Sequence, residues 1–129
     1  MILDTTFLVD VLNSEDDVAE LVADLDASGT SMVAATTVME LWEGIHRADA
    51  MEREREAVEE LLEGLREVPF DRDCAMKAGE VHADLLSDGR RIDVEDVMIG
   101  ATALVHDVPV ATRNVSHFER IGDLEVVSY

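Results

Sequence analysis

The stretch MILDTTFLVDVL, residues 1–12, opens the chain with an apolar tripeptide, one carboxylate, two threonines and a second apolar run. The tripeptide is typical of a buried strand, so Asp4 stands where the strand at residues 1–4 ends. Burying a lone carboxylate costs several kcal/mol unless a positive group pairs with it. The first Arg or Lys along the chain is Arg47. A base from a distant segment or a metal ion must therefore compensate the charge of Asp4.

Length and composition indicate one domain over residues 1–129, since 47% of the residues are hydrophobic and supply a core. No apolar run approaches the ~20 residues of a membrane span, and no signal-peptide pattern opens the chain, so we expect a soluble, cytoplasmic protein. The one cysteine, Cys74, excludes an internal disulfide and is expected to be a small core residue.

The net charge of −20 arises from thirty Asp and Glu against ten Lys and Arg. The acids are spread through amphipathic segments, which favours adaptation to a very salty cytoplasm over a disordered acidic tail. At molar salt, charges are screened over ~3 Å, and self-repulsion becomes tolerable. The acidic character therefore does not exclude a nucleic-acid substrate.

Short apolar runs alternate with amphipathic segments along the chain, which predicts an α/β fold. Pro69 predicts that the third strand lies at an edge of the sheet. Repeated βα alternation favours a central, mostly parallel sheet of about five short strands with helices on both faces. Strands are expected at 1–4, 31–35, 66–70, 108–112 and 124–129. Helices are expected after residue 4, around 18–25 before a turn at 28–29, at 38–45, 58–65 and 71–88, and from about 93.

Polar side chains follow several of these strands, and ligands of open α/β sheets bind outside the carboxyl ends of the strands. Each acid alone is also compatible with a helix cap or a first-turn residue, and for Asp93 an N-cap is preferred. Gly100, four residues after Asp96, predicts open space above that carboxylate. The set comprises Asp4 after the first strand, Thr36 and Thr37 ending the second, Glu40 in the next helix's first turn, Asp96 one turn into the late helix, and Asn114 after 108–112.

Carboxylate oxygens without His or Cys suit Mg²⁺ or Mn²⁺ rather than zinc. A divalent cation removes the repulsion among Asp4, Glu40 and Asp96, and it can activate water and stabilise displacement at a phosphodiester. We therefore predict that these three residues are metal ligands and catalytic residues.

Four motifs together resemble the PIN-domain ribonucleases of the VapC toxin type, and the resemblance runs essentially end to end. Asp4, Glu40 and Asp96 match the first three acids of that family. The family's fourth acid is variable, and Asn114 occupies the corresponding position in this chain. His117 lies nearby, at a position where many relatives carry an acid. The motifs are ILDTTFLVDVL (2–12), TTVMELWEG (36–44), GRRIDVEDVMIGATAL (89–104) and VPVATRNVSHFERI (108–121).

The resemblance implies a PIN-like fold and a Mg²⁺-dependent endoribonuclease, with Mn²⁺ as a substitute, that cleaves structured RNA such as tRNA or rRNA. It also implies a homodimer inhibited by a VapB-type antitoxin. Asn114 is expected to be an outer-shell ligand, so the site has charge enough for one divalent ion but not for two.

Several other residues are candidates for substrate or partner contact, and each of them also has a purely structural interpretation. The hydroxyls of Thr6 and Thr37 would hold metal-bound waters or a phosphate, or would merely cap helices. His117 is a substrate contact or, by preference, plain helix surface, and Trp42 belongs to the core or to an antitoxin groove. Arg90, Arg91 and Arg113 would meet the RNA backbone or only neutralise surface charge.

Two other function classes remain compatible with the sequence. A haloacid-dehalogenase-like phosphotransferase also begins with a strand-ending Asp, but it needs a second Asp where this chain has Thr6, and the only lysine, Lys77, falls mid-helix. A PIN scaffold with a decayed metal site would only bind a partner. Three intact acids argue against it, and metal-dependent RNA cleavage distinguishes the two.

Overall fold

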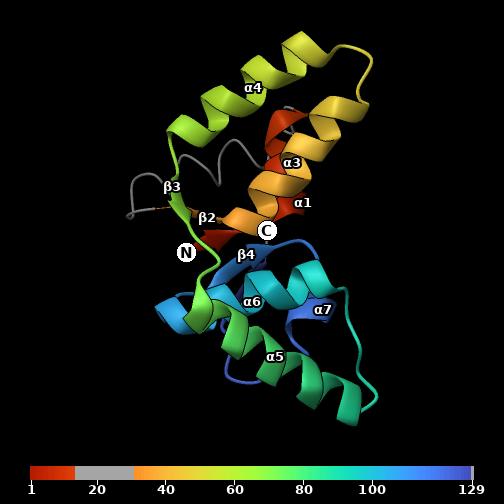
Figure 1. Cartoon of the computed structure of the whole chain (residues 1–129), viewed down its shortest axis with the longest axis vertical. Helices are drawn as coiled ribbons and strands as arrows, with labels where there is room; N and C mark the ends of the chain where they lie inside the picture. The colour runs from red at the N-terminus through yellow and green to blue at the C-terminus, as the bar shows by residue number, and fades with distance from the viewer. Residues whose placement is uncertain (14–30, 129) are drawn as a thin grey trace.

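A five-stranded parallel sheet separates two groups of helices in the computed structural model, which describes residues 1–13 and 31–128 (Figure 1). The strand order is β3-β2-β1-β4-β5, so the first strand of the chain lies at the centre. The strands are β1 (Ile2–Leu3), β2 (Met32–Ala34), β3 (Arg66–Val68), β4 (Val110–Thr112) and β5 (Val126–Ser128). The helices are α1 (Thr5–Leu12), α3 (Ala35–Arg47), α4 (Met51–Glu63), α5 (Arg72–Ser87), α6 (Val94–His106) and α7 (Val115–Phe118).

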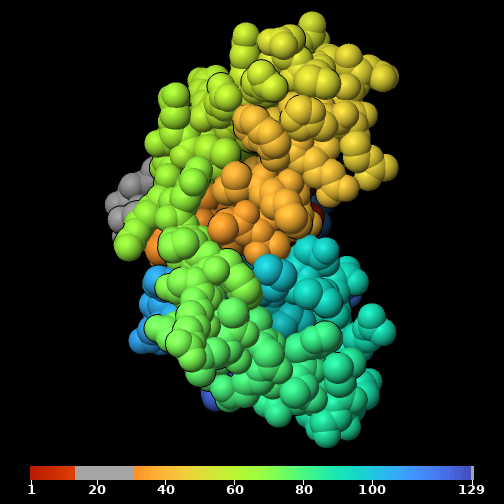
Figure 2. Space-filling model, in the orientation of Figure 1, coloured from red at the N-terminus to blue at the C-terminus, as the bar shows by residue number. Residues whose placement is uncertain are grey.

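Alternate residues of the central strands face two separate cores, as expected for a parallel sheet covered on both faces. Ile2 and Val110 belong to the core beneath α5 and α6, whereas Leu3 and Ala111 belong to the core beneath α1, α3 and α4. The two helix groups form two lobes of the face in Figure 2, α3 and α4 above and α5 and α6 below. Within the described residues, no helix is long and apolar enough to cross a bilayer.

Most of the predicted elements are confirmed, and β3 is an edge strand as Pro69 indicated. The second strand, however, ends at Ala34, so Thr36 and Thr37 lie in the first turn of α3 rather than in a strand. Glu40 consequently lies in the second turn, not the first. β-branched threonines favour strands, but packing overrides this preference here, because both side chains are buried against neighbouring elements.

Two further differences from the sequence analysis concern the helices α6 and α7. The short helix α7 follows β4 where no helix was delimited, and Asp96 lies within the first turn of α6. The helix expected around 18–25 and the turn at 28–29 lie outside the described residues.

Gly100 serves a different purpose from the one predicted. A Cβ atom there would lie 2.5 Å from Cδ1 of Ile121 and 3.4 Å from Cδ2 of Leu124. The glycine therefore lets α6 pack closely against the chain after α7, and the prediction of open space above Asp96 is wrong. The sequence could not reveal this, since residues 121 and 124 are remote from Gly100 along the chain.

Alanine at the two helical glycines Gly79 and Gly100 should change stability in opposite directions. Gly79 is exposed in α5 with nothing within 4 Å of a Cβ atom. Gly79→Ala should raise the free energy of unfolding by about 0.5–1 kcal/mol. Gly100→Ala should lower it by about 1–2 kcal/mol, because overpacking outweighs the helix propensity. Urea denaturation measures both changes, and a stabilised Gly100→Ala would contradict the packing explanation.

Candidate active site

Asp4 directly follows β1 and is only 2% exposed. Its Oδ1 accepts a hydrogen bond of 2.9 Å from the backbone N–H of Phe7, which caps α1. Its Oδ2 accepts one of 2.5 Å from the hydroxyl of Thr112, the last residue of β4. The carboxylate is therefore held between a helix start and a neighbouring strand end.

The environment of Asp4 favours its neutral form. Burial raises the pKa of Asp4 from 3.8 to about 6, although the hydrogen bonds from Thr112 and Phe7 act in the opposite direction. Repulsion from the carboxylates of Asp96 and Asp10 makes a smaller contribution to this rise. A buried acid with acidic neighbours is the arrangement that a cation would stabilise.

Glu40 reaches from α3 toward the start of α1. The Thr5 hydroxyl donates a 2.7 Å hydrogen bond to Oε1 of Glu40 and lies 3.2 Å from the hydroxyl oxygen of Thr37. Partial burial raises the pKa of Glu40, and the acids Glu95, Asp96 and Asp4 add repulsion against the effect of Thr5.

The contact with Glu40 involves a threonine that the sequence analysis did not single out. Thr5 holds the second acid, and the only signal for it was its place directly after Asp4. Thr37 is completely buried behind Thr5, so its hydroxyl is not placed to meet a phosphate.

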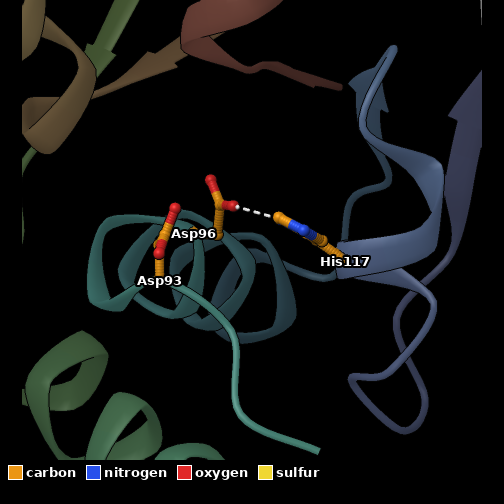
Figure 3. Close-up of side chains that lie close together, drawn as sticks. All are labelled: Asp93, Asp96 and His117. Carbon is orange, nitrogen blue, oxygen red and sulfur yellow. Dashed lines mark hydrogen bonds and ion pairs between the residues drawn. The ribbon is translucent and has the colours of Figure 1, made fainter.

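Asp96 lies in the first turn of α6 and meets residues of α7 (Figure 3). Its Oδ2 is 3.1 Å from Nδ1 of His117, and the same ring nitrogen is 3.1 Å from Nδ2 of Asn114. Burial raises the pKa of Asp96, His117 lowers it, and Asp93 and Glu95 raise it. One ligand atom each of Asp93, Asp96 and His117 lie within 4.8 Å of one another.

The preference for His117 as plain helix surface is wrong. The short helix α7 begins right after β4, and its last residue, Phe118, is fully buried. This anchorage turns His117 toward α6, where it contacts Asp96. Asp93 does occupy the N-cap position of α6, but its side chain makes no capping hydrogen bond.

The three predicted acids influence one another electrostatically although they come from three segments. Asp96 raises the pKa of both Asp4 and Glu40, and Asp4 raises that of Glu40. Asn114 is tied to the same place, because its backbone N–H donates to the Thr112 hydroxyl that bonds Asp4. The fold therefore brings Asp4, Glu40, Asp96 and Asn114 to one end of the sheet.

The three predicted arginines have different surroundings. Arg113 follows β4 and forms a 2.9 Å ion pair with the buried carboxylate of Asp10, a residue of α1 that the sequence analysis missed. Arg90 lines a groove between α5 and residues 120–123, which none of the three acids lines. The backbone oxygen of Arg91 accepts a hydrogen bond from Arg120.

A small cleft between α1, α3 and α4 runs up to the site. Thr5 and Glu40 line its polar end, and Val9, Leu12 and Val58 line its apolar part. Trp42 packs on the neighbouring core, with the Arg55 guanidinium 5.8 Å from its ring centre.

The chain is similar to known proteins in both sequence and structure. The PIN domain model matches residues 1–124. Ribonuclease VapC19 of Mycobacterium tuberculosis is 34% identical over 125 residues, 96% of each chain. A tRNA(fMet)-specific endonuclease VapC of Shigella flexneri is 28% identical over 96 residues, 74% of this chain and 73% of that protein. A DNA-bound VapBC structure from Salmonella typhimurium matches with a TM-score of 0.90 at 27% identity, over 98% of this chain and 96% of that one. The chain belongs to the PIN-domain family and, within it, to the VapC proteins.

Proposed function

We propose that this protein is a VapC-type toxin that hydrolyses RNA phosphodiester bonds with Mg²⁺, for which Mn²⁺ can substitute. The observation that carries the proposal is the meeting of Asp4, Glu40 and Asp96 from three segments. Burial raises the pKa of each acid, and the charge of Asp96 raises the pKa of the other two further. Membership of the PIN family removes the haloacid-dehalogenase-like alternative. A catalytically decayed binding module is the remaining alternative, and the cleavage assays below decide it.

The residues present fit a divalent ion. Their donors are carboxylate oxygens, which Mg²⁺ prefers, and their repulsion is what such an ion relieves. Asp4, Glu40 and Asp96 would hold the ion, with Asn114 in the outer shell. When bound, the ion supplies an activated water and stabilises the charge that develops at the phosphodiester.

The surrounding residues keep the acids in place. The hydroxyls of Thr112 and Thr5 donate to Asp4 and Glu40 and so orient one oxygen of each carboxylate. Arg113, exposed beside Asp10, would meet an RNA phosphate, and Arg90 and Arg91 would contact the RNA farther from the acids. A relative specific for tRNA(fMet) supports tRNA as the first substrate to examine, with rRNA as the second.

The similarity to a VapBC structure also supports a proposal for the protein partner of this chain. The VapBC match supports a VapB-type antitoxin for this chain, and the cleft of α1, α3 and α4 would receive an antitoxin segment next to Glu40. We also propose that the protein is cytoplasmic and acts as a homodimer.

The pH dependence of stability should identify Asp4 as a buried acid. Because its folded pKa of about 6 exceeds its ordinary value of 3.8, its stabilising contribution is present below pH ~4 and is lost as pH rises through about 6. In buffer that contains a metal chelator, Asp4→Asn should have a free energy of unfolding about 1–3 kcal/mol higher than wild type above pH 6. This difference should vanish toward pH 4.

Urea denaturation at several pH values measures the gain of Asp4→Asn. The control is Glu59→Gln, which removes an exposed charge from α4 and should differ little from wild type throughout. A gain for Asp4→Asn that stays constant between pH 4 and 8 would contradict the burial explanation.

Substitution of the site acids should separate ligation from overall charge. Asp4→Asn, Glu40→Gln and Asp96→Asn should each reduce Mg²⁺-dependent RNA cleavage by about a hundredfold or more, in line with losing a group that stabilises the transition state. Glu59→Gln and Glu63→Gln remove exposed charges from the same chain and should retain full activity. Cleavage of labelled tRNA and rRNA measures all five. Equal losses in both groups would attribute the effect to charge or stability, and full activity in the first group would end the assignment.

Asn114 should control how tightly Mg²⁺ is held. Three negative charges neutralise one divalent ion but not two, so calorimetry should find one Mg²⁺ per RNA-free chain. Asn114→Asp adds a carboxylate and should lower the Mg²⁺ concentration for half-maximal cleavage by roughly tenfold. Two tight Mg²⁺ sites in the wild type, or no effect of the substitution, would place Asn114 outside the metal centre.

A further inference from the structure

Helix α1 buries one charged side chain. Its buried residues are Phe7, Leu8 and Asp10, and the Asp10 side chain is only 12% exposed. A buried carboxylate is destabilising unless a positive group pairs with it. Nη2 of Arg113, which follows β4, lies 2.9 Å from Oδ2 of Asp10. This ion pair therefore compensates the buried charge, and it joins α1 to the end of β4.

The two members of the ion pair differ in exposure. The Arg113 side chain is 55% exposed, whereas the carboxylate of Asp10 is buried. A guanidinium group carries five N–H donors in a rigid plane, so it can bind a carboxylate along one edge and a phosphate along another. A positive group that a buried partner holds and that solvent still reaches is suited to bind an anion.

The ion pair also lies next to the proposed metal centre. Arg113 directly follows Thr112, whose hydroxyl donates to Asp4. The same hydroxyl accepts from the backbone N–H of Asn114. The charge of Asp10 is close enough to Asp4 to raise the pKa of that carboxyl. The segment that carries Arg113 is therefore fixed to the first acid of the site.

Positive charge at this place matters because the chain has little of it. Ten Lys and Arg stand against thirty Asp and Glu, and the acids Asp93 and Glu95 lie on the α6 side of the site. RNA phosphates are bound mainly by Lys and Arg. A mobile arginine must be immobilised when it binds a phosphate, which costs affinity. An arginine that is already held in the free protein avoids this loss.

We propose that Asp10 is a positioning residue for RNA binding. It holds the Arg113 guanidinium beside the metal centre, where the exposed edge of that group binds a phosphate of the RNA chain. The inference rests on the proposed function in taking RNA as the substrate. Asp10 itself touches neither the RNA nor the metal, so its effect falls on RNA affinity rather than on the chemical step.

The direction of change in one substitution tests the proposal. Asp10→Asn removes a negative charge near the site, so electrostatics alone would strengthen RNA binding. If Asp10 positions Arg113, Asp10→Asn should instead raise KM for labelled tRNA about fivefold and keep kcat within about twofold of wild type. Cleavage kinetics with Mg²⁺ measure both constants, and urea denaturation checks that the variant is folded. An unchanged or lower KM, or a loss confined to kcat, would overturn the proposal.

A double substitution shows whether Asp10 acts through Arg113. Arg113→Gln removes the phosphate contact itself, so it should weaken tRNA binding about tenfold and reduce the slope of log Kd against log salt by about one. In the Arg113→Gln protein, adding Asp10→Asn should not weaken binding further. Fluorescence anisotropy measures these Kd values in an Asp96→Asn background, which preserves the tRNA. Equal weakening by Asp10→Asn with and without Arg113 would contradict the positioning role.

Two further comparisons protect the test. Arg113→Gln removes the partner of a buried charge, and where it fails to fold, the double variant replaces it. The Kd should then rise from wild type to Asp10→Asn and again to the double variant, and any other order would overturn the proposal. The matched control is Glu43→Gln, which breaks an exposed ion pair with Arg47 on α3 and should leave KM and Kd unchanged.

The failure of this inference and of the proposed function are separable. Binding of tRNA that depends on Asp10 through Arg113, in a protein that cleaves no RNA, would leave the inference standing and remove the function. Asp4-dependent cleavage, together with a Kd that Asp10→Asn does not change, would do the reverse. A wild type that binds neither tRNA nor rRNA would overturn both.

Discussion

The hydrogen bond between the Thr112 hydroxyl and the buried Asp4 carboxylate joins the elements on which the site depends. Asp4 directly follows the central strand and caps α1. Thr112 ends the adjacent strand β4, which α7 follows. The same hydroxyl accepts from the backbone N–H of Asn114, which sets where α7 begins. Two polar groups thus fix the relative positions of α1, β4 and α7, and through α7 the position of His117.

Charge explains why such a centre needs a counter-ion. The chain carries a net charge of −20, and the acids of the site lie in surroundings that raise the pKa of each. The ion pair of Arg113 with Asp10 supplies positive charge nearby, on the α1 side of Asp4. On the α6 side the neighbours Asp93 and Glu95 add further negative charge. The divalent ion proposed above would compensate this concentration of negative charge around a buried carboxylate.

The architecture could be predicted from the sequence because periodicity and chain order determine it. Apolar strands alternating with amphipathic helices require a covered parallel sheet, and Pro69 excluded a central position for β3. The positions of Asp4 and Glu40 were predicted from the ends of the first two strands, and that of Asp96 from the start of the late helix. The roles of Thr5, His117 and Gly100 could not be predicted in this way. Each depends on which side chain an element turns toward a remote neighbour: Thr5 toward Glu40, His117 toward Asp96, and Gly100 toward Ile121.

The separation of 108 residues between Asp4 and Thr112 also has a consequence for synthesis of the protein. The central strand β1 is made first, but one of its two neighbours, β4, is among the last segments to be made. At about 5–20 residues per second, a ribosome needs about 5–20 s to extend the chain from Asp4 to Thr112. During that interval Asp4 lacks its partner Thr112, so the hydrogen bond that holds its carboxylate forms only when nearly the whole chain has been made.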